Sequence, residues 1–329
     1  MSVESKSRST KEFIFLYLKG MAMGAADVVP GVSGGTIAFI TGIYEELLNT
    51  IKGFNLTILT TLKNEGIVAT WKETNATFLA VLFAGIFTSV ISLAKGITYL
   101  LDTYPILLWA FFFGLIVASS IIIGRYIKTW GAKELVAIVV GGVVAFYITV
   151  AAPSQIPEGL VYIFLAGCIA ICAMILPGIS GSFILLLLGA YATVLGSISG
   201  LVDGLKAADT EMILEYGINI AVFIGGCIVG IIAFSNFLSW MFKKAYSTTM
   251  ALLTGFMIGS LNKVWPWKET TQYRTNSHGE EVPFLQTNIS PNSFEQLTGE
   301  PSQLWFAVAL CIAGFLLVFV MEKMASQKG

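Results

Sequence analysis

Long apolar stretches alternate with short polar ones along most of this 329-residue chain. A helix needs about 20 residues to cross the hydrocarbon core of a bilayer, and six of the stretches come close to that length or exceed it. They predict about six full membrane spans, at residues 78–100, 105–124, 134–152, 217–242, 248–264 and 303–321. The pattern therefore predicts an all-α polytopic membrane protein.

Two further apolar stretches, 12–51 and 159–199, are interrupted near the middle by the phrase Pro-Gly-x-Ser-Gly. Proline ends the incoming helix because it lacks an N–H donor, and glycine permits the chain to reverse. Each arm has about 17 residues, which is near the lower limit for a span. Each stretch is therefore expected to form a broken helical hairpin, which either re-enters on its own side or crosses the membrane twice.

The two interruptions are copies of one phrase, because Val28–Gly35 returns 147 positions later as Ile175–Ser182. The same offset holds for further pairs: Gly20 with Gly167, Gly42 with Gly189, and Tyr44 with Tyr191. Weaker similarities relate 113–119 to 254–260 and 82–85 to 222–225. This duplication predicts two related halves, a first repeat over 12–152 and a second over 153–322. In transporters, paired interruptions of this kind point to the binding site.

The charges of the polar loops predict how the halves are oriented, because cytoplasmic loops are enriched in Lys and Arg. Basic residues flank the first broken stretch and occupy the turn at 125–133, whereas the 200–216 loop is mainly acidic. Residues 1–11 and the tail 323–329 are then cytoplasmic, and the polar segment 265–302, flanked by tryptophans of an interfacial belt, is extracytoplasmic. Each half crosses the membrane an odd number of times, so the second half is inverted relative to the first.

Composition supports the membrane setting and excludes other classes. The chain is 56% hydrophobic and 12% charged, with a mean hydropathy of +0.80, whereas soluble domains are about one-quarter charged. A net charge of −1 gives no basic surface for nucleic acid. The four cysteines lie in apolar runs without a C-x-x-C pattern, so we expect buried thiols, with no metal and no cofactor.

The repeated phrase predicts a site for an anion. Irregular backbone cannot face lipid, so each phrase must be buried in protein or line a polar cavity. Ser33 and Ser180 are suited to cap the outgoing helix, whose N-terminus attracts phosphate or carboxylate. The alternative is that these small residues only permit close helix packing. The candidate substrate-binding residues in the two phrases are Pro30, Gly31, Ser33, Gly34, Gly35 and Thr36, then Pro177, Gly178, Ser180, Gly181 and Ser182.

Charged residues within apolar sequence are further candidates. Asp27 precedes the first phrase, and its counterpart in the second half is Met174. Its carboxylate either binds a proton or cation and so couples transport, or repels the anion during release, or serves as a dipole partner for the outgoing helix. Lys95 and Arg125 either reach a bound phosphate or extend to the interface from helix ends.

The letters Gly-x-Ser-Gly also occur around the nucleophile of intramembrane serine proteases. Such a serine needs a base within hydrogen-bond reach, and the single histidine, His278, lies in the polar segment. Lys95 could replace the histidine in a Ser-Lys dyad, but nothing in the sequence brings it to Ser33 or Ser180. We therefore expect a transporter rather than an enzyme.

The segments Gly24–Thr36 and Leu176–Ser182 resemble the bacterial polyprenyl-phosphate transporter family PopT, formerly a membrane domain of unknown function. The resemblance covers roughly 12–322. It implies a flippase that returns undecaprenyl phosphate across the bacterial cytoplasmic (inner) membrane and so recycles the lipid carrier for cell envelope biogenesis. The family's motif positions fall here on Asp27, Pro30, Gly31, Ser33, Gly34, Gly35, Pro177, Gly178, Ser180 and Gly181.

A phosphate head on a long isoprenoid tail fits a buried anion site that is open laterally to lipid. Inward movement of an anion against the membrane potential costs about 2.3 kcal/mol per charge per 100 mV, so coupling to protons or cations is expected. The alternative from the residues alone is an ion-coupled transporter of a small soluble anion, because helix ends do not distinguish a lipid phosphate from sulfate or a carboxylate.

Overall fold

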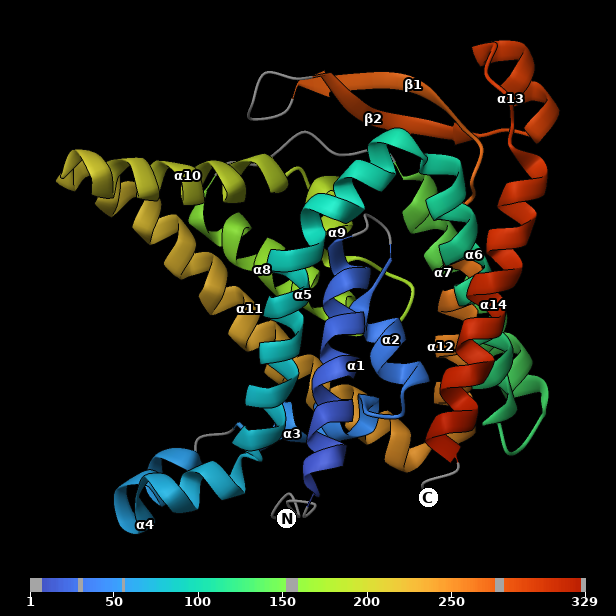
Figure 1. The fold of residues 1–329 in the computed structure, drawn as a ribbon. Helices are drawn as coiled ribbons and strands as arrows, with labels where there is room; N and C mark the ends of the chain where they lie inside the picture. Colours follow the sequence, from blue (N-terminus) through green and yellow to red (C-terminus); the bar gives the residue numbers. More distant parts are fainter. Residues whose placement is uncertain (1–7, 29–31, 55–56, 152–158, 276–280, 327–329) are drawn as a thin grey trace.

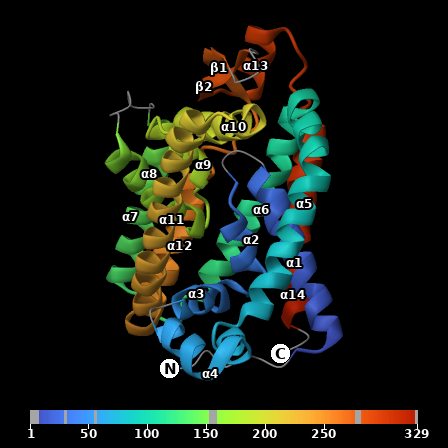
Figure 2. The same ribbon diagram turned by 90° about the vertical axis from the view of Figure 1, so that its left-hand side faces the viewer.

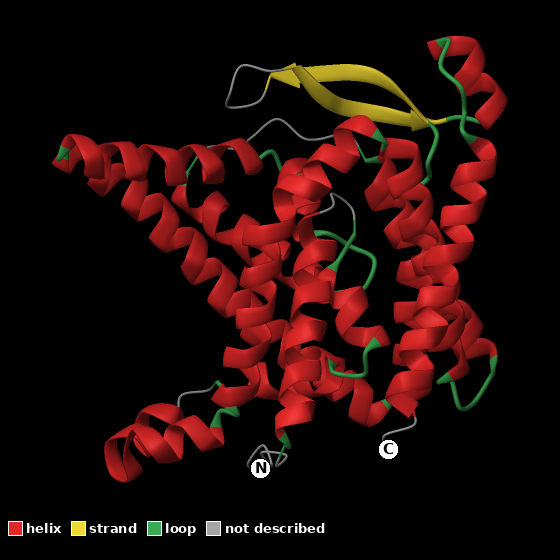
Figure 3. Ribbon diagram, in the orientation of Figure 1, coloured by secondary structure: helices red, strands yellow, loops and turns green. Residues whose placement is uncertain are grey.

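The computed structural model describes residues 8–28, 32–54, 57–151, 159–275 and 281–326. Helices make up nearly all of this part of the chain, and strands occur only at one end (Figure 3). Both termini lie at the opposite end from these strands (Figure 1). The prediction of an all-α polytopic membrane protein is confirmed for the bulk of the molecule.

The first half contains seven helices within the described residues. They are α1 (Thr10–Val28), α2 (Gly34–Ile40), α3 (Tyr44–Gly53), α4 (Thr57–Glu73), α5 (Ala76–Thr103), α6 (Pro105–Arg125) and α7 (Ala132–Val150). The broken stretch 12–51 forms α1, α2 and α3. The sequence predicted its break at the phrase but not the second break between α2 and α3.

The second half has a matching series of helices and one additional polar unit. Its elements are α8 (Leu160–Ile175), α9 (Gly181–Leu187), α10 (Tyr191–Ala207), α11 (Thr210–Lys244), α12 (Tyr246–Ser260), β1 (Lys268–Thr275), β2 (Glu281–Asn288), α13 (Pro291–Thr298) and α14 (Leu304–Ser326). The broken stretch 159–199 falls on α8, α9 and the first part of α10, and the chain bends by 106° between α9 and α10.

The second breaks of the two halves are built alike. Gly42 follows α2 with φ +72°, and Gly189 follows α9 with φ +75°. A positive φ is strained for residues with a side chain and easy for glycine. The offset that paired these glycines in the sequence therefore pairs two turns of the same backbone conformation.

Four helices of the described residues are long and apolar enough to span a membrane: α5, α6, α7 and α11. The bent pair α9 and α10 raises this to five if it counts as one span. Two predicted spans correspond to shorter helices, because α12 ends at Ser260 and the apolar part of α14 is Leu304–Val320. The predicted span 248–264 was too long, since Val264 is fully buried in the core beyond the end of α12.

The helices pack in two layers, which Figure 2 separates clearly. One layer contains α1, α5, α6 and α14, and the other contains α7, α8, α11 and α12. Within the layers α1 packs on α5 and α6 on α14, while α8 packs on α11 and α7 on α12. Two of these pairs join the halves, because α7 of the first half packs on α12 of the second, and α14 of the second half packs on α6 of the first.

Glycines set the close approach of these helices. A Cβ on Gly20 or Gly85 would clash with backbone between α1 and α5, at Leu82 O and Tyr17 O respectively. The matching contacts between α8 and α11 involve Gly167 with Phe223 O, and Gly226 with Phe164 O. By these contacts, Gly85 of the first half corresponds to Gly226 of the second. The sequence similarity of 82–85 to 222–225 aligns Gly85 with Gly225 instead, which is one residue earlier.

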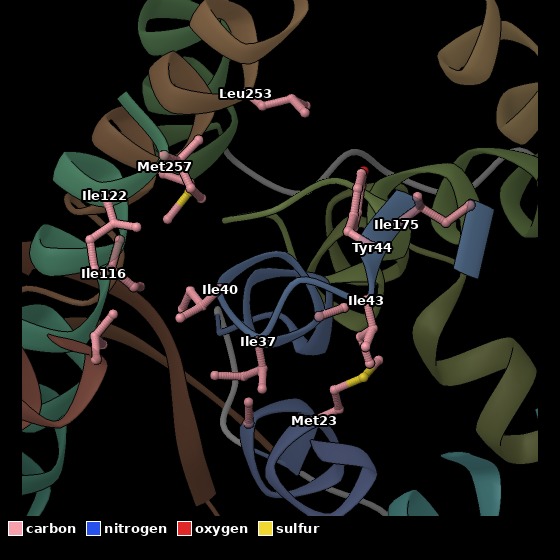
Figure 4. Packing of buried hydrophobic residues seen from close by; sticks show 14 of the residues in the cluster. Met23, Ile37, Ile40, Ile43, Tyr44, Ile116, Ile122, Ile175, Leu253 and Met257 are labelled. Carbon is pink, nitrogen blue, oxygen red and sulfur yellow. The ribbon is translucent and has the colours of Figure 1, made fainter. Parts of the chain in front are cut away.

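Helix α2 lies inside the molecule between the layers. Its residues are buried except for Phe39, and apolar side chains surround it (Figure 4). Met23 comes from α1, Ile116 from α6, and Met257 from α12. The described end of the first phrase, residues 32–35, is therefore held in the protein interior, as irregular backbone at membrane depth requires.

The polar segment 265–302 has a fold of its own that the sequence did not predict. Strands β1 and β2 form an antiparallel hairpin, and α13 follows. Trp265 Nε1 donates to Ile289 O and Trp267 Nε1 to Ser302 O, both at 2.9 Å. The expected interfacial belt is wrong for Trp267, which is buried because it anchors this unit, whereas Trp305 is 82% exposed.

Candidate functional site

The two repeated phrases are in direct contact. Ser33 Oγ lies 3.3 Å from Leu176 O and 3.4 Å from Met174 O, at the end of α8. Gly178 N donates a hydrogen bond of 2.9 Å to Thr36 Oγ1 of α2. These contacts join residues more than 140 positions apart in sequence. The start of α2 and the second phrase therefore form one polar region in the interior.

The first phrase already holds a carboxylate. Ser33 occupies the N-cap position of α2, and its Oγ accepts a bond of 3.1 Å from Gly35 N. Asp27 Oδ1 accepts a bond of 2.6 Å from Gly34 N. A negative charge at a helix N-terminus is favourable, and here the protein supplies it. Asp27 thus fills the place that an external anion would take at the first phrase.

The second phrase is open by comparison. Ser180 lies at the N-cap position of α9, but it makes no side-chain capping bond, so the expectation that both serines cap their helices holds only for Ser33. Its Oγ instead lies 2.9 Å from Ser182 Oγ. Met174 stands where the first half has Asp27 and carries no charge. The second phrase therefore presents two hydroxyl groups, and the position that matches Asp27 supplies no carboxylate to it.

A small cavity adjoins the second phrase. Gly178, Ile179 and Ser180 line one side of it, and Thr149, Phe183 and Lys263 line the rest, with Ala145 and Ile148. Pro177 and Gly178 are buried beside it, and Gly178 has φ +86°, which suits glycine at the reversal. This cavity places a lysine near the open phrase, and the sequence analysis did not identify that lysine.

The basic candidates from the sequence lie elsewhere. Arg125 ends α6 at the end of the molecule that carries the termini (Figure 1), and its guanidinium lies 5.5 Å from the centre of the Phe319 ring. Lys95 belongs to α5, and its side chain is outside the described part. Pro30 and Gly31 also lie outside the described residues. Arg125 is therefore not part of the region where the phrases meet.

Serine hydrolysis has no support from the hydrogen bonds of the two serines. Within the described residues, Ser33 Oγ bonds to backbone groups and Ser180 Oγ bonds to Ser182. His278 is outside the described residues. The four cysteines are free thiols, and Cys168 Sγ donates to Gly226 O at 3.0 Å, a contact between α8 and α11. The prediction of buried thiols is therefore only partly right, because all four are half-buried.

Long apolar helices in two layers, broken at two matching phrases that meet inside, define a polytopic membrane transporter. The chain matches the family described as VCA0040-like, undecaprenyl phosphate translocase-like, over residues 23–282, and it belongs to that family. The resemblance of the phrases to polyprenyl-phosphate transporters is thereby confirmed.

Two relatives cover most of the chain. A protein of Vibrio cholerae serotype O1 named polyprenyl-phosphate transporter is 47% identical over 318 residues, which are 97% of this chain and 99% of the relative. A protein of Staphylococcus aureus with the same name is 33% identical over 261 residues, 76% of this chain and 85% of the relative. No solved structure matches the chain.

Proposed function

We propose that this protein is a flippase that moves a polyprenyl phosphate, with undecaprenyl phosphate as the expected substrate, between the leaflets of the bacterial cytoplasmic membrane. The observation that carries the proposal is its similarity over nearly the full chain to a protein named polyprenyl-phosphate transporter. Return of the carrier from the outer to the inner leaflet would recycle it for cell envelope biogenesis.

The head group is proposed to bind where the two phrases meet, on the side of the second one. Ser180 presents a hydroxyl group there, with Ser182 Oγ 2.9 Å from it, and Lys263 lines the same small cavity as Ser180. A phosphate accepts bonds from hydroxyl and ammonium donors, and such charge-assisted bonds are the stronger ones. The first phrase is less suited, because Asp27 already occupies its helix end. Its residues Gly34, Gly35 and Thr36 are proposed to shape the site from the other side.

An inverted repeat with two re-entrant hairpins is the proposed architecture for this movement. Helices α5 and α7 run away from the end with the termini and α6 runs back, whereas α11 and α14 run toward that end and α12 runs away (Figure 1). The paired glycine turns and the paired glycine contacts support the same relation. Opposed halves around a central site suit alternating access.

The test is leaflet exchange in liposomes of the purified full-length protein. Labelled undecaprenyl phosphate is added to one leaflet, and its accessibility to an impermeant reagent is followed under imposed proton and sodium gradients. The double variant Ser180→Ala/Ser182→Ala should slow exchange by at least about tenfold, because two hydroxyl donors to a charged phosphate are removed. The matched control is Ser120→Ala, a buried serine that bonds only within α6, to Ile116 O.

Absence of exchange by the wild type under every gradient would reject the lipid assignment. Accumulation of labelled inorganic phosphate or sulfate without lipid exchange would instead identify a transporter of a small soluble anion. Equal exchange by the serine double variant and the wild type would leave the flippase in place and remove the head group from the second phrase.

A further inference from the structure

A cavity of about 510 Å³ lies between the helices and the β-hairpin, at the end of the molecule opposite the termini. Its walls come from the end of α7, from α9, from the turn after α12 and from both strands. This volume lies within the range of small-molecule sites, about 300–1,000 Å³. Neither the family match nor the names of the relatives assign a site at this position.

Two lysines give this cavity its charge. Lys263 lies in the turn after α12 and Lys268 at the start of β1, and both line the cavity. The Nζ of Lys263 is 4.2 Å from the centre of the Phe183 ring, and that of Lys268 is 3.8 Å from the centre of the Trp109 ring. Lys268 Nζ also donates a bond of 2.7 Å to Lys263 O. The two ammonium groups are thus directed to aromatic rings and a carbonyl.

No carboxylate balances these charges within the described residues. Among the described residues, neither Lys263 nor Lys268 has an ion-pair partner, and the lining of the cavity contains no acidic side chain. Burial lowers the pKa of Lys263, and burial together with the charge of Lys263 lowers the pKa of Lys268 well below its usual value. Buried charge without a partner is costly, and a bound anion would supply the partner.

Side-chain amides fix the wall that carries Lys263. Asn262 Nδ2 donates to Thr149 Oγ1 of α7 at 2.7 Å. Asn288 Nδ2 at the end of β2 lies 2.7 Å from Asn262 O and 2.9 Å from Asn262 Oδ1. These bonds connect α7, the turn and the hairpin. The backbone that carries the two lysines is therefore held in place before any ligand arrives, which reduces the entropic cost of binding.

The cavity continues toward the second phrase. Thr149, Phe183 and Lys263 line both this cavity and the small one that contains Gly178 and Ser180. Lys263 thus stands between the hairpin and the open phrase. Lys263 and Ser180 line the same small cavity, so the lysine and this hydroxyl are neighbours.

We propose that Lys263 and Lys268 form a capture site for a phosphate monoester, which receives the head group beneath the β-hairpin and passes it to the second phrase. This inference rests on the proposed function for the identity of the lipid. The ligand chemistry common to a polyprenyl phosphate and free phosphate is the phosphate group, and both sources are compared in the test.

The experiment measures binding of undecaprenyl phosphate, undecaprenol and inorganic phosphate to the full-length protein in nanodiscs. Lys263→Gln and Lys268→Gln should each weaken binding of undecaprenyl phosphate by about tenfold or more, because each removes a charge-assisted bond. Lys206→Gln is the matched control, since Lys206 is exposed and pairs with Asp203 on α10. Undecaprenol, which lacks the phosphate, should bind the wild type and both variants equally.

A second measurement needs no substitution in the cavity and so does not depend on the folding of a variant. The wild type is treated with an amine-reactive reagent, and modification of Lys263 and Lys268 is followed by mass spectrometry. Undecaprenyl phosphate should protect both lysines, and undecaprenol should not. Equal modification with and without undecaprenyl phosphate would overturn the capture site.

The outcomes separate this proposal from the proposed function. Lipid exchange that is normal in both lysine variants, with unchanged binding, would reject the capture site and leave the flippase intact. Lack of exchange by the wild type would reject the flippase instead. Protection by inorganic phosphate alone would overturn capture of a lipid head group and support a site for the soluble anion.

Discussion

At the scale of single residues, the structures of the two phrases differ because Asp27 precedes the first phrase and Met174 precedes the second. Asp27 bonds to Gly34 N and closes the first phrase, while Met174 leaves the second phrase without a carboxylate. The sequence identified this asymmetry but left the role of Asp27 open. It did not identify Lys263 and Lys268, because their burial arises only when the hairpin covers them. A lysine directly after a helix end looks like an ordinary interfacial residue in sequence.

The charge of Asp27 is expected to couple transport to a cation gradient. Asp27→Asn keeps an oxygen that accepts from Gly34 N, so the start of α2 should remain folded, but the negative charge is lost. Flipping by this variant should no longer accelerate when a proton or sodium gradient is imposed, whereas the wild type should respond. The measurement is the liposome exchange assay over a range of pH values and ionic conditions.

Glu45→Gln is the control for Asp27→Asn, since Glu45 is an exposed carboxylate in the first turn of α3. It should respond to the gradient as the wild type does. Full flipping rates of Asp27→Asn at every pH and ionic condition would reject the coupling role and leave Asp27 as a structural partner of α2.

At the scale of elements, the sequence predicted the long apolar helices, because length and apolarity are enough to identify them. α5, α6, α7 and α11 begin and end within a few residues of their predicted spans, apart from the N-terminal extension of α11. The strands β1 and β2 were missed because their residues are polar and carry no apolar alternation over a shared core. The break after α2 was missed although Gly42 and Gly189 were paired, since a lone glycine in an apolar run also fits a packed helix.

The packing of α8 on α11 depends on which of two adjacent glycines faces α8. A Cβ on Gly226 would clash with Phe164 O, whereas a Cβ on Gly225 would lie 3.9 Å from Phe164 Cε2, an ordinary contact. Gly226→Ala should therefore lower the free energy of unfolding by about 1–3 kcal/mol through overpacking, and Gly225→Ala should change it little. Thermal unfolding of the purified protein in detergent measures both. A lower Tm for Gly225→Ala alone would contradict the contact.

At the scale of the whole molecule, the two ends carry different chemistry. Helix α4, which carries Lys63 and Lys72, lies at the end with the termini, together with the basic turn after α6 (Figure 1). The opposite end carries the β-hairpin and the acidic residues Asp203 and Asp209 around the end of α10. Because basic loops stay in the cytoplasm, we expect the hairpin and the cavity beneath it to face outward.

This orientation determines what the lysine cavity does. Facing outward, it would collect the head group from the outer leaflet; facing the cytoplasm, it would release it. The side of the membrane that each end faces can be measured with single cysteines in a chain whose four native cysteines are replaced. The two positions are Gln272 in β1 and Lys63 in α4, which are both exposed. An impermeant thiol reagent should label Gln272→Cys in intact spheroplasts, and Lys63→Cys only after permeabilisation. The reverse pattern would make the cavity the exit of the transport path, with the second phrase loaded from the other side.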